Sequence, residues 1–180
     1  MSVFRGLRDR LRRQPDANED QLLSRQFDFF VYDFEVQYRN LISTLTKAIN
    51  RDPTNVNALH NRGTAYDEIG ESRAALADFD RAISLSTAPA QTLGRRAMAK
   101  ANLGDFAGAV DDYTRAIELD PSPGLFARRS RAYQSLGNVE LAAADDLRAK
   151  NLLAVDPQTQ GFLQVAEKMR SRTSSDTHER

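Results

Sequence analysis

The chain has 180 residues, and its 25 basic and 25 acidic side chains give a formal net charge of zero, so no field of one sign attracts nucleic acid. Because cysteine is absent, disulfides, thiolate nucleophiles, iron–sulfur clusters and the usual structural zinc sites are excluded. No apolar run approaches the roughly 20 residues that cross a bilayer, and the N-terminus MSVFRGLRDRLRR has no apolar secretory stretch. We therefore expect a cytoplasmic protein with no cofactor, no metal and no nucleic-acid partner.

Residues 1–20 form a basic N-terminal segment. Within residues 3–13, five arginines and one aspartate surround an apolar stripe at helical spacing, made of Val3, Phe4, Leu7 and Leu11. A basic amphipathic helix can rest on an anionic membrane or partner. A peripheral membrane adaptor acting through residues 3–13 is therefore one alternative function.

An aromatic stretch follows, and over residues 22–55 we predict a degenerate helical hairpin that lacks a glycine turn. Its second helix has apolar residues at Leu41, Leu45, Ala48 and Ile49. Its first helix is apolar on more than one side, with Phe27, Phe30 and Phe34 on one face and Phe29, Tyr32 and Val36 on the next. We expect these apolar faces to pack against the next hairpin, a hydrophobic ligand, the N-terminal segment or a second copy of the chain. A self-associating structural protein, such as a homodimer, is thus another alternative function.

Three similar units then follow, at about residues 56–89, 90–122 and 123–155. In each, apolar residues recur at helical spacing on both sides of a glycine, at Gly70, Gly104 and Gly137, which predicts helix, tight turn, helix. Small residues allow the helices to approach closely. They are Gly63, Ala97 and Ser130 on the first helices, and Ala75, Ala109 and Ala142 on the second.

The third unit departs from the pattern, because Asp146 and Lys150 replace apolar residues of its second helix. Two alternatives are open. Either the leucines between 141 and 153 take over through a slip of one residue, or this face is partly solvated. After this helix, Asp156 and Pro157 are a typical helix start, and we predict a capping helix at 156–172. Its apolar stripe is Phe162, Val165, Ala166 and Met169, and residues 173–180 form a disordered tail.

An arginine on each first helix is followed, 16 residues later, by an aspartate on the second helix. We predict a structural ion pair within each hairpin, which fixes geometry more than it adds stability. The pairs are Arg62 with Asp78, Arg96 with Asp112, and Arg129 with Asp145.

The spacing of large, small and aromatic residues resembles the tetratricopeptide repeat, whose pattern recurs every 34 residues. The residues that carry this resemblance are Leu59, Gly63, Tyr66, Ala75, Phe79 and Ala82, and then Leu93, Ala97, Ala109, Tyr113, Ala116 and Pro121. It covers about residues 22–155, although Lys100 replaces an aromatic of the pattern. The resemblance implies an all-α, right-handed solenoid of stacked hairpins, whose first helices line a concave groove that binds a peptide or protein.

Side chains two residues before and one residue after the small residue of each first helix share the face toward the expected groove. The groove candidates are Asn61, Arg95, Met98, Arg128 and Arg131, with Phe30 and Phe34 toward the other end. Arginines there suit a carboxylate or an acidic segment, although the carboxylate clamp of some family members is incomplete because Gln26, Phe30 and Gln91 replace its lysine or asparagine. The alternative is that these arginines are simply solvated.

No catalytic motif accompanies this pattern, since phosphate-binding loops, HExxH and Gly-x-Ser-x-Gly sequences are all missing. His60 stands alone in the sequence, and His178 belongs to the polar tail. We therefore expect a non-catalytic interaction module or scaffold whose partner is a protein or peptide.

Overall fold

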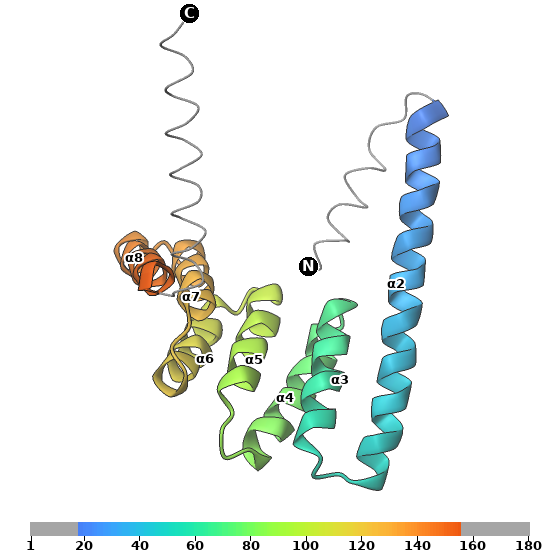
Figure 1. Cartoon of the computed structure of the whole chain (residues 1–180), viewed down its shortest axis with the longest axis horizontal. Coiled ribbons are helices and arrows are strands. Elements are labelled where there is room, and N and C mark those ends of the chain that lie inside the picture. The colour runs from blue at the N-terminus through green and yellow to red at the C-terminus, as the bar shows by residue number, and fades with distance from the viewer. Residues whose placement is uncertain (1–17, 156–180) are drawn as a thin grey trace, which may run out of the picture. The chain divides into compact units, whose positions relative to one another are not determined.

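The computed structural model describes residues 18–155, and every regular element in that range is an α-helix (Figure 1). Contacts within the chain divide it into two compact units, Met1–Asp120 and Pro121–Arg180. The first contains α2 (Asn18–Arg51), α3 (Val56–Glu68), α4 (Ser72–Leu85), α5 (Ala90–Asn102) and α6 (Phe106–Leu119), and the second contains α7 (Pro123–Ser135) and α8 (Val139–Val155). The all-α class that the sequence predicts is confirmed.

Helices α3 and α4, α5 and α6, and α7 and α8 pack as hairpins. In the first turn, the Glu71 N–H donates to the Tyr66 carbonyl at 2.8 Å and the Gly70 N–H donates to the Asp67 carbonyl at 3.0 Å. This Schellman pattern satisfies the carbonyls at the helix end, but it requires a left-handed residue, which glycine adopts without strain. The φ angles are +82° at Gly70, +86° at Gly104 and +78° at Gly137. The predicted turn glycines therefore end the first helix of every hairpin.

The hairpins pack closely where a small residue of one helix meets a large one of the other. A Cβ atom added to Gly63 on α3 would lie 2.8 Å from Cε1 of Phe79 on α4, so a larger residue would displace the ring. Phe79 is fully buried and forms a core cluster with Ala75 and Ala99. Because Ala99 belongs to α5, this cluster also joins the first hairpin to the second.

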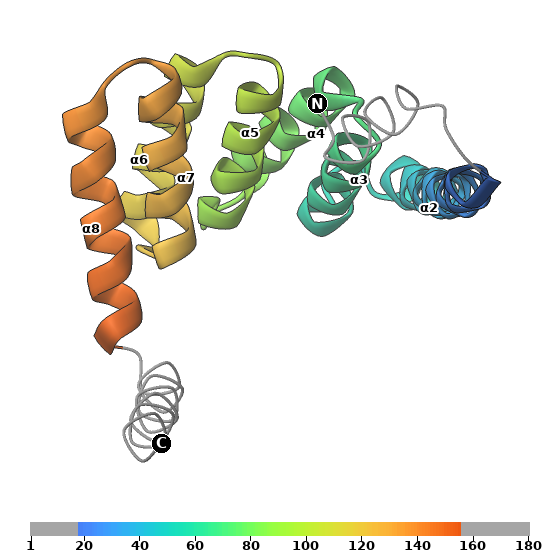
Figure 2. The same cartoon turned by 90° about the horizontal axis from the view of Figure 1, so that it is seen from above.

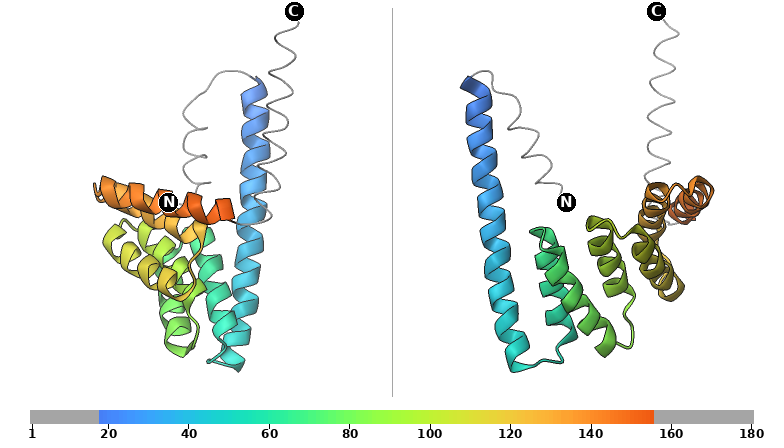
Figure 3. Two further views of the ribbon diagram at one scale, coloured as in Figure 1. Left: turned by 60° about the vertical axis from the view of Figure 1, so that its left-hand side comes forward. Right: turned by 180° about the vertical axis from the view of Figure 1, so that it is seen from behind.

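Helix α2 corrects one expectation. The hairpin predicted over residues 22–55 is absent, and a single helix of 34 residues occupies most of that range. The reason is that residues 16–52 contain neither glycine nor proline, so nothing supplies the left-handed turn or breaks the helix. At 1.5 Å per residue, α2 is about 51 Å long against about 20 Å for α3, and it extends beyond α3 in Figures 1 and 3.

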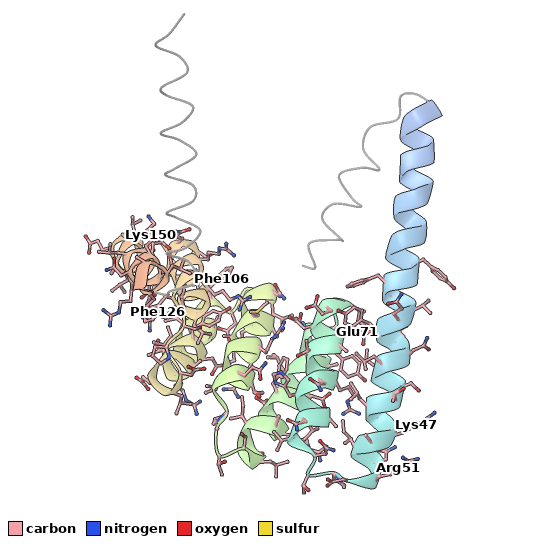
Figure 4. The ribbon with its side chains drawn as sticks, viewed as in Figure 1. Lys47, Arg51, Glu71, Phe106, Phe126 and Lys150 are labelled. Carbon is pink, nitrogen blue, oxygen red and sulfur yellow. The ribbon has the colours of Figure 1, made fainter. Side chains whose placement is uncertain are left out.

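The C-terminal half of α2 packs against α3 as the second helix of a repeat would. Ile49 is buried together with Ala58, Leu59 and Ala82 from the following hairpin. Closer to the N-terminus of α2, Arg39 Nη1 lies 3.4 Å from Oε1 of Glu71, a residue labelled in Figure 4. The apolar residues predicted for a second helix therefore do contact the next hairpin, although no first helix precedes them as a separate element.

The second unit settles the two alternatives for the third repeat. Helix α8 runs without interruption beside α7 (Figure 2), and Ala142, Asp145 and Ala149 are its buried residues. These are the positions of the repeat pattern, so there is no slip of register. Leu141, Leu147 and Leu153 are exposed instead, which corresponds to the solvated alternative within the described residues.

Several predicted segments lie outside the described residues. They are the first 17 residues of the basic segment 1–20, with the stripe at 3–13, and then the capping helix 156–172 and the tail 173–180.

Candidate functional site

Helices α3 and α5 are the first helices of successive hairpins, and polar side chains link them along their length. The His60 Nδ1 atom lies 2.9 Å from Thr92 Oγ1. Further along, Arg95 Nη1 is 3.6 Å from Glu68 Oε1, and Asn102 Nδ2 donates to the Asp67 carboxylate at 3.2 Å. We call the surface at these contacts the α3–α5 face.

Arg95 is the candidate groove residue at the centre of the α3–α5 face. Its side chain is 36% exposed, and its separation from Glu68 is long for an ion pair. Exposed pairs of this kind contribute only about 0–1 kcal/mol, so a ligand carboxylate can compete for the guanidinium. The pKa of His60 is lowered, first by burial of the imidazole and second by the positive charge of Arg95.

The remaining groove candidates fall in different parts of the molecule. Asn61 is exposed beside His60, and Met98 is half-buried one turn after Arg95. Arg128 and Arg131 are exposed on α7, in the second unit. On α2, the half-buried Phe34 ring lies 4.5 Å from the Tyr38 ring. The Phe30 side chain lies outside the described part of the chain.

The structure brings together each arginine and aspartate that the sequence analysis paired. Two parallel hydrogen bonds join the partners in every hairpin, from Nε to Oδ2 and from Nη2 to Oδ1. These bonds measure 2.7 and 2.6 Å for Arg62 with Asp78, 2.7 and 2.6 Å for Arg96 with Asp112, and 2.8 and 2.8 Å for Arg129 with Asp145. This bidentate geometry joins the two helices of each hairpin through a matched pair of opposite charges.

Burial of these pairs sets their protonation. Burial alone would raise the pKa of Asp112, but hydrogen bonds from Arg96 and Lys100 outweigh it, so this pKa lies below its ordinary value. The pKa of Arg96 is raised, chiefly by its hydrogen bonds to Asp112. The pKa of Arg62 is raised in the same way by Asp78. Arg96 and Asp112 therefore both stay charged near neutral pH.

Two contacts that sequence reasoning missed connect hairpins to the helix before them. Arg62 Nη1 donates to Thr46 Oγ1 of α2 at 3.1 Å, and Arg96 Nη1 donates to Asp80 Oδ1 of α4 at 2.7 Å. The signal was present in the sequence, because Thr46 and Asp80 each precede their arginine by 16 residues. These arginines therefore bridge three successive helices.

Lys100, which replaces an aromatic of the repeat pattern, has a structural role. Its Nζ atom lies 2.8 Å from Asp112 Oδ2, so the buried carboxylate is shared by a lysine and an arginine. The corresponding Tyr66 and Tyr133 instead present their rings to Arg62 and Arg129 at 5.9 and 5.8 Å. The departure from the pattern thus exchanges a cation–π contact for a second ion pair.

Among the side chains that the structure describes, no group of three or more His, Cys, Asp or Glu could hold a metal ion. The helices in the same range include none that is long and apolar enough to cross a membrane.

The described hairpins, with their glycine turns and alternating small and large residues, define an all-α repeat protein. Family models for the tetratricopeptide repeat match residues 90–123 and 44–77. The chain thus contains tetratricopeptide repeats in these two segments. The second match begins within α2, in agreement with the packing of its C-terminal half as a second helix.

Solved structures support the same fold. A crystal structure of MamA is 22% identical, with a TM-score of 0.62, and the alignment covers 82% of this chain and 85% of that chain. The first TPR of Spaghetti (RPAP3) bound to the HSP90 peptide SRMEEVD is 22% identical, with a TM-score of 0.53 and coverage of 64% of this chain and 93% of that one. The Cut9–Hcn1 hetero-tetramer of APC/C is 19% identical, with a TM-score of 0.60, and the alignment covers 76% of this chain and 26% of that chain. The comparison with curated protein sequences finds no match.

Proposed function

We propose that this chain is a non-catalytic interaction module, which holds a peptide or protein segment against the α3–α5 face. The observation that carries the proposal is Arg95, a partly exposed guanidinium on a first helix whose ion pair with Glu68 is long, at 3.6 Å. A carboxylate of the partner would bind there through charge-assisted hydrogen bonds. Exposed Asn61 and half-buried Met98 would supply polar and apolar contacts on either side.

The second unit offers the same chemistry on α7, where Arg128 and Arg131 are exposed. An acidic partner is therefore favoured over a basic or neutral one. The solved tetratricopeptide domain with the peptide SRMEEVD gives a precedent, since that protein binds a segment with two glutamates and a C-terminal aspartate. The chain as a whole is neutral, so the preference for an acidic partner would come from the arginines at the binding surface and not from the net charge of the protein.

The direct test is fluorescence anisotropy with a library of short peptides that have acidic C-termini. Arg95→Glu should weaken binding of the selected peptides at least about tenfold, which corresponds to about 1.4 kcal/mol. Arg73→Glu reverses an exposed arginine on α4, a second helix, and serves as the matched control with unchanged binding. Equal affinity of the wild type and Arg95→Glu would contradict this placement of the partner.

Self-association through α2 is a second candidate. Tyr32 is 69% exposed, and Val36 is exposed one turn later on the same side of this helix. Apolar contact between two copies would cover these side chains. Light scattering at micromolar concentration separates the two functions, because a monomer argues against assembly.

The membrane adaptor, in turn, would be dismissed if liposome binding survived deletion of residues 3–13.

A further inference from the structure

The imidazole of His60 on α3 has one ring nitrogen with a partner in the protein and one without. Its Nδ1 atom lies 2.9 Å from Thr92 Oγ1 of α5, and the side chain is half-buried. Among the residues that the structure describes, none makes a hydrogen bond with the Nε2 atom. His60 belongs to the α3–α5 face, so a bound segment on that face would meet a ring nitrogen that the fold does not use.

Thr92 decides which of the two nitrogens carries the proton of the neutral imidazole. This threonine is only 5% exposed, and within the described residues the His60 ring is the hydrogen-bond partner of its hydroxyl. A buried hydroxyl needs an acceptor for its proton, and Nδ1 accepts only when the ring proton is on Nε2. The hydrogen-bond partners therefore indicate a neutral His60 that presents Nε2–H as a donor.

The groups around the ring leave it neutral and beside a cation. Arg95 follows Thr92 by three residues, one turn further along α5. Its charge is the second cause that lowers the pKa of His60, after burial of the ring. From α4 the ring faces Phe79, whose centroid is 6.1 Å away, and no charged side chain of α2 or α4 contributes to the shift within the described part of the chain. An anion drawn to Arg95 would therefore find an uncharged N–H donor on the neighbouring helix.

We propose that His60 is a second binding residue for the acidic partner, donating its Nε2–H to the segment that Arg95 attracts; this inference rests on the function proposed above. Thr92 is a positioning residue, because it holds the imidazole in the tautomer that donates. A bound carboxylate would also favour the charged imidazole, since an opposite charge nearby raises the pKa of a histidine. Binding should therefore take up protons and become tighter as the pH falls.

Nitrogen NMR of the free chain tests the tautomer without any ligand. His178→Gln removes the other histidine of the sequence, so every imidazole signal then belongs to His60. At pH 7.5 the spectrum should show a protonated Nε2 and an unprotonated Nδ1. Adding Thr92→Val, which removes the hydroxyl at nearly constant shape, should shift the ring toward a mixture of the two tautomers. A ring that carries its proton on Nδ1 in the presence of Thr92 would overturn the proposal.

Two conservative variants of His60 then separate donation to the partner from packing. Glutamine places its amide nitrogen near the position of Nε2, whereas asparagine places its own near that of Nδ1. In the anisotropy assay with the selected acidic peptides, His60→Asn should weaken binding about five- to tenfold at pH 7.5. His60→Gln should retain most of the affinity, and circular dichroism should show equal helicity. The wild type should bind at least about threefold more tightly at pH 5.5 than at pH 7.5, and both variants should lack this gain.

The outcomes distinguish this inference from the proposed function. Unchanged affinity in His60→Asn, together with the loss expected in Arg95→Glu, would overturn the role of His60 and leave the proposed function standing. Unchanged affinity in both variants, or no binding of any acidic peptide by the wild type, would overturn the two together. Equal wild-type affinity at pH 5.5 and pH 7.5 would place the bound anion away from the imidazole and would also contradict the inference.

Discussion

At the scale of single residues, the carboxylate of Asp112 binds two cationic side chains of the middle hairpin. It accepts hydrogen bonds from Nε and Nη2 of Arg96 and pairs with Lys100 Nζ, and only 3% of its side chain is exposed. Asp80 contacts the same arginine but is 62% exposed. The two acids therefore share one partner while differing in burial, which makes them a matched pair for measuring what burial contributes.

We expect Asp112→Asn to lower the free energy of unfolding by about 3 kcal/mol, because it removes the buried counter-charge that Arg96 and Lys100 share, although Arg96 keeps its contact with the exposed Asp80. Asp80→Asn should cost less than about 1 kcal/mol, since water can replace its exposed carboxylate. Urea unfolding followed by circular dichroism measures both. Equal effects of the two variants would show that the Asp112 network does not hold the hairpin together.

His60 makes stability depend on pH in a defined direction. Because burial and Arg95 lower its pKa from the ordinary value of 6.5, the unfolded chain takes up a proton before the folded chain does. Stability is therefore fully present above about pH 6.5 and is lost as the pH falls through the folded pKa, with a slope of at most about 1.4 kcal/mol per pH unit. His60→Gln should flatten this dependence in Tm measurements between pH 5 and 8. An unchanged slope in the variant would assign the effect to other groups.

At the scale of elements, hairpin formation depends on where the chain can adopt a left-handed backbone. Gly70, Gly104 and Gly137 each provide this at the end of a first helix. Between residues 16 and 52 no glycine or proline occurs, and α2 continues through the position where a turn would fall. The presence or absence of glycine and proline thus distinguishes the hairpins of this protein from its one long helix.

Gly104→Ala should lower the free energy of unfolding by about 1–2 kcal/mol, because alanine is strained at a φ of +86° although nothing lies near its Cβ. The matched control is Gly124→Ala on α7, where the added Cβ also meets open space but the backbone is helical. This variant should be neutral or stabilising by up to about 1 kcal/mol. Chemical denaturation compares them, and a destabilising Gly124→Ala with a neutral Gly104→Ala would contradict the conformational argument.

The same elements explain what the sequence could predict. Glycine and proline positions mark the hairpins at 56–89, 90–122 and 123–155, so these helices could be placed before the structure was known. The hairpin at 22–55 was predicted from apolar spacing alone, which cannot distinguish two short helices from one long one. The three intrahairpin pairs follow from a fixed interval along the chain. Contacts such as Arg95 with Glu68 depend on how one hairpin is set against the next, which composition does not specify.

At the scale of the whole molecule, the arginine and aspartate that recur 16 residues apart in each described hairpin bind to each other within that hairpin. Arg62, Arg96 and Arg129 are held by buried aspartates. Arg95, Arg128 and Arg131 are more exposed than these three arginines. The charges proposed for recognition are therefore the ones that are not held by a buried aspartate of the same hairpin.

The most direct test of this account is quantitative affinity capture from the native host, with mass spectrometry to identify the partner and purified components to repeat the measurement. Wild type should retain a specific protein, and Arg95→Glu combined with Arg128→Glu should reduce its recovery at least about tenfold at equal helicity. Arg73→Glu combined with Arg115→Glu, with the same charge change on second helices, should leave recovery unchanged. Full recovery with the Arg95 and Arg128 reversal, or chemical conversion of the purified partner by the chain, would contradict the account.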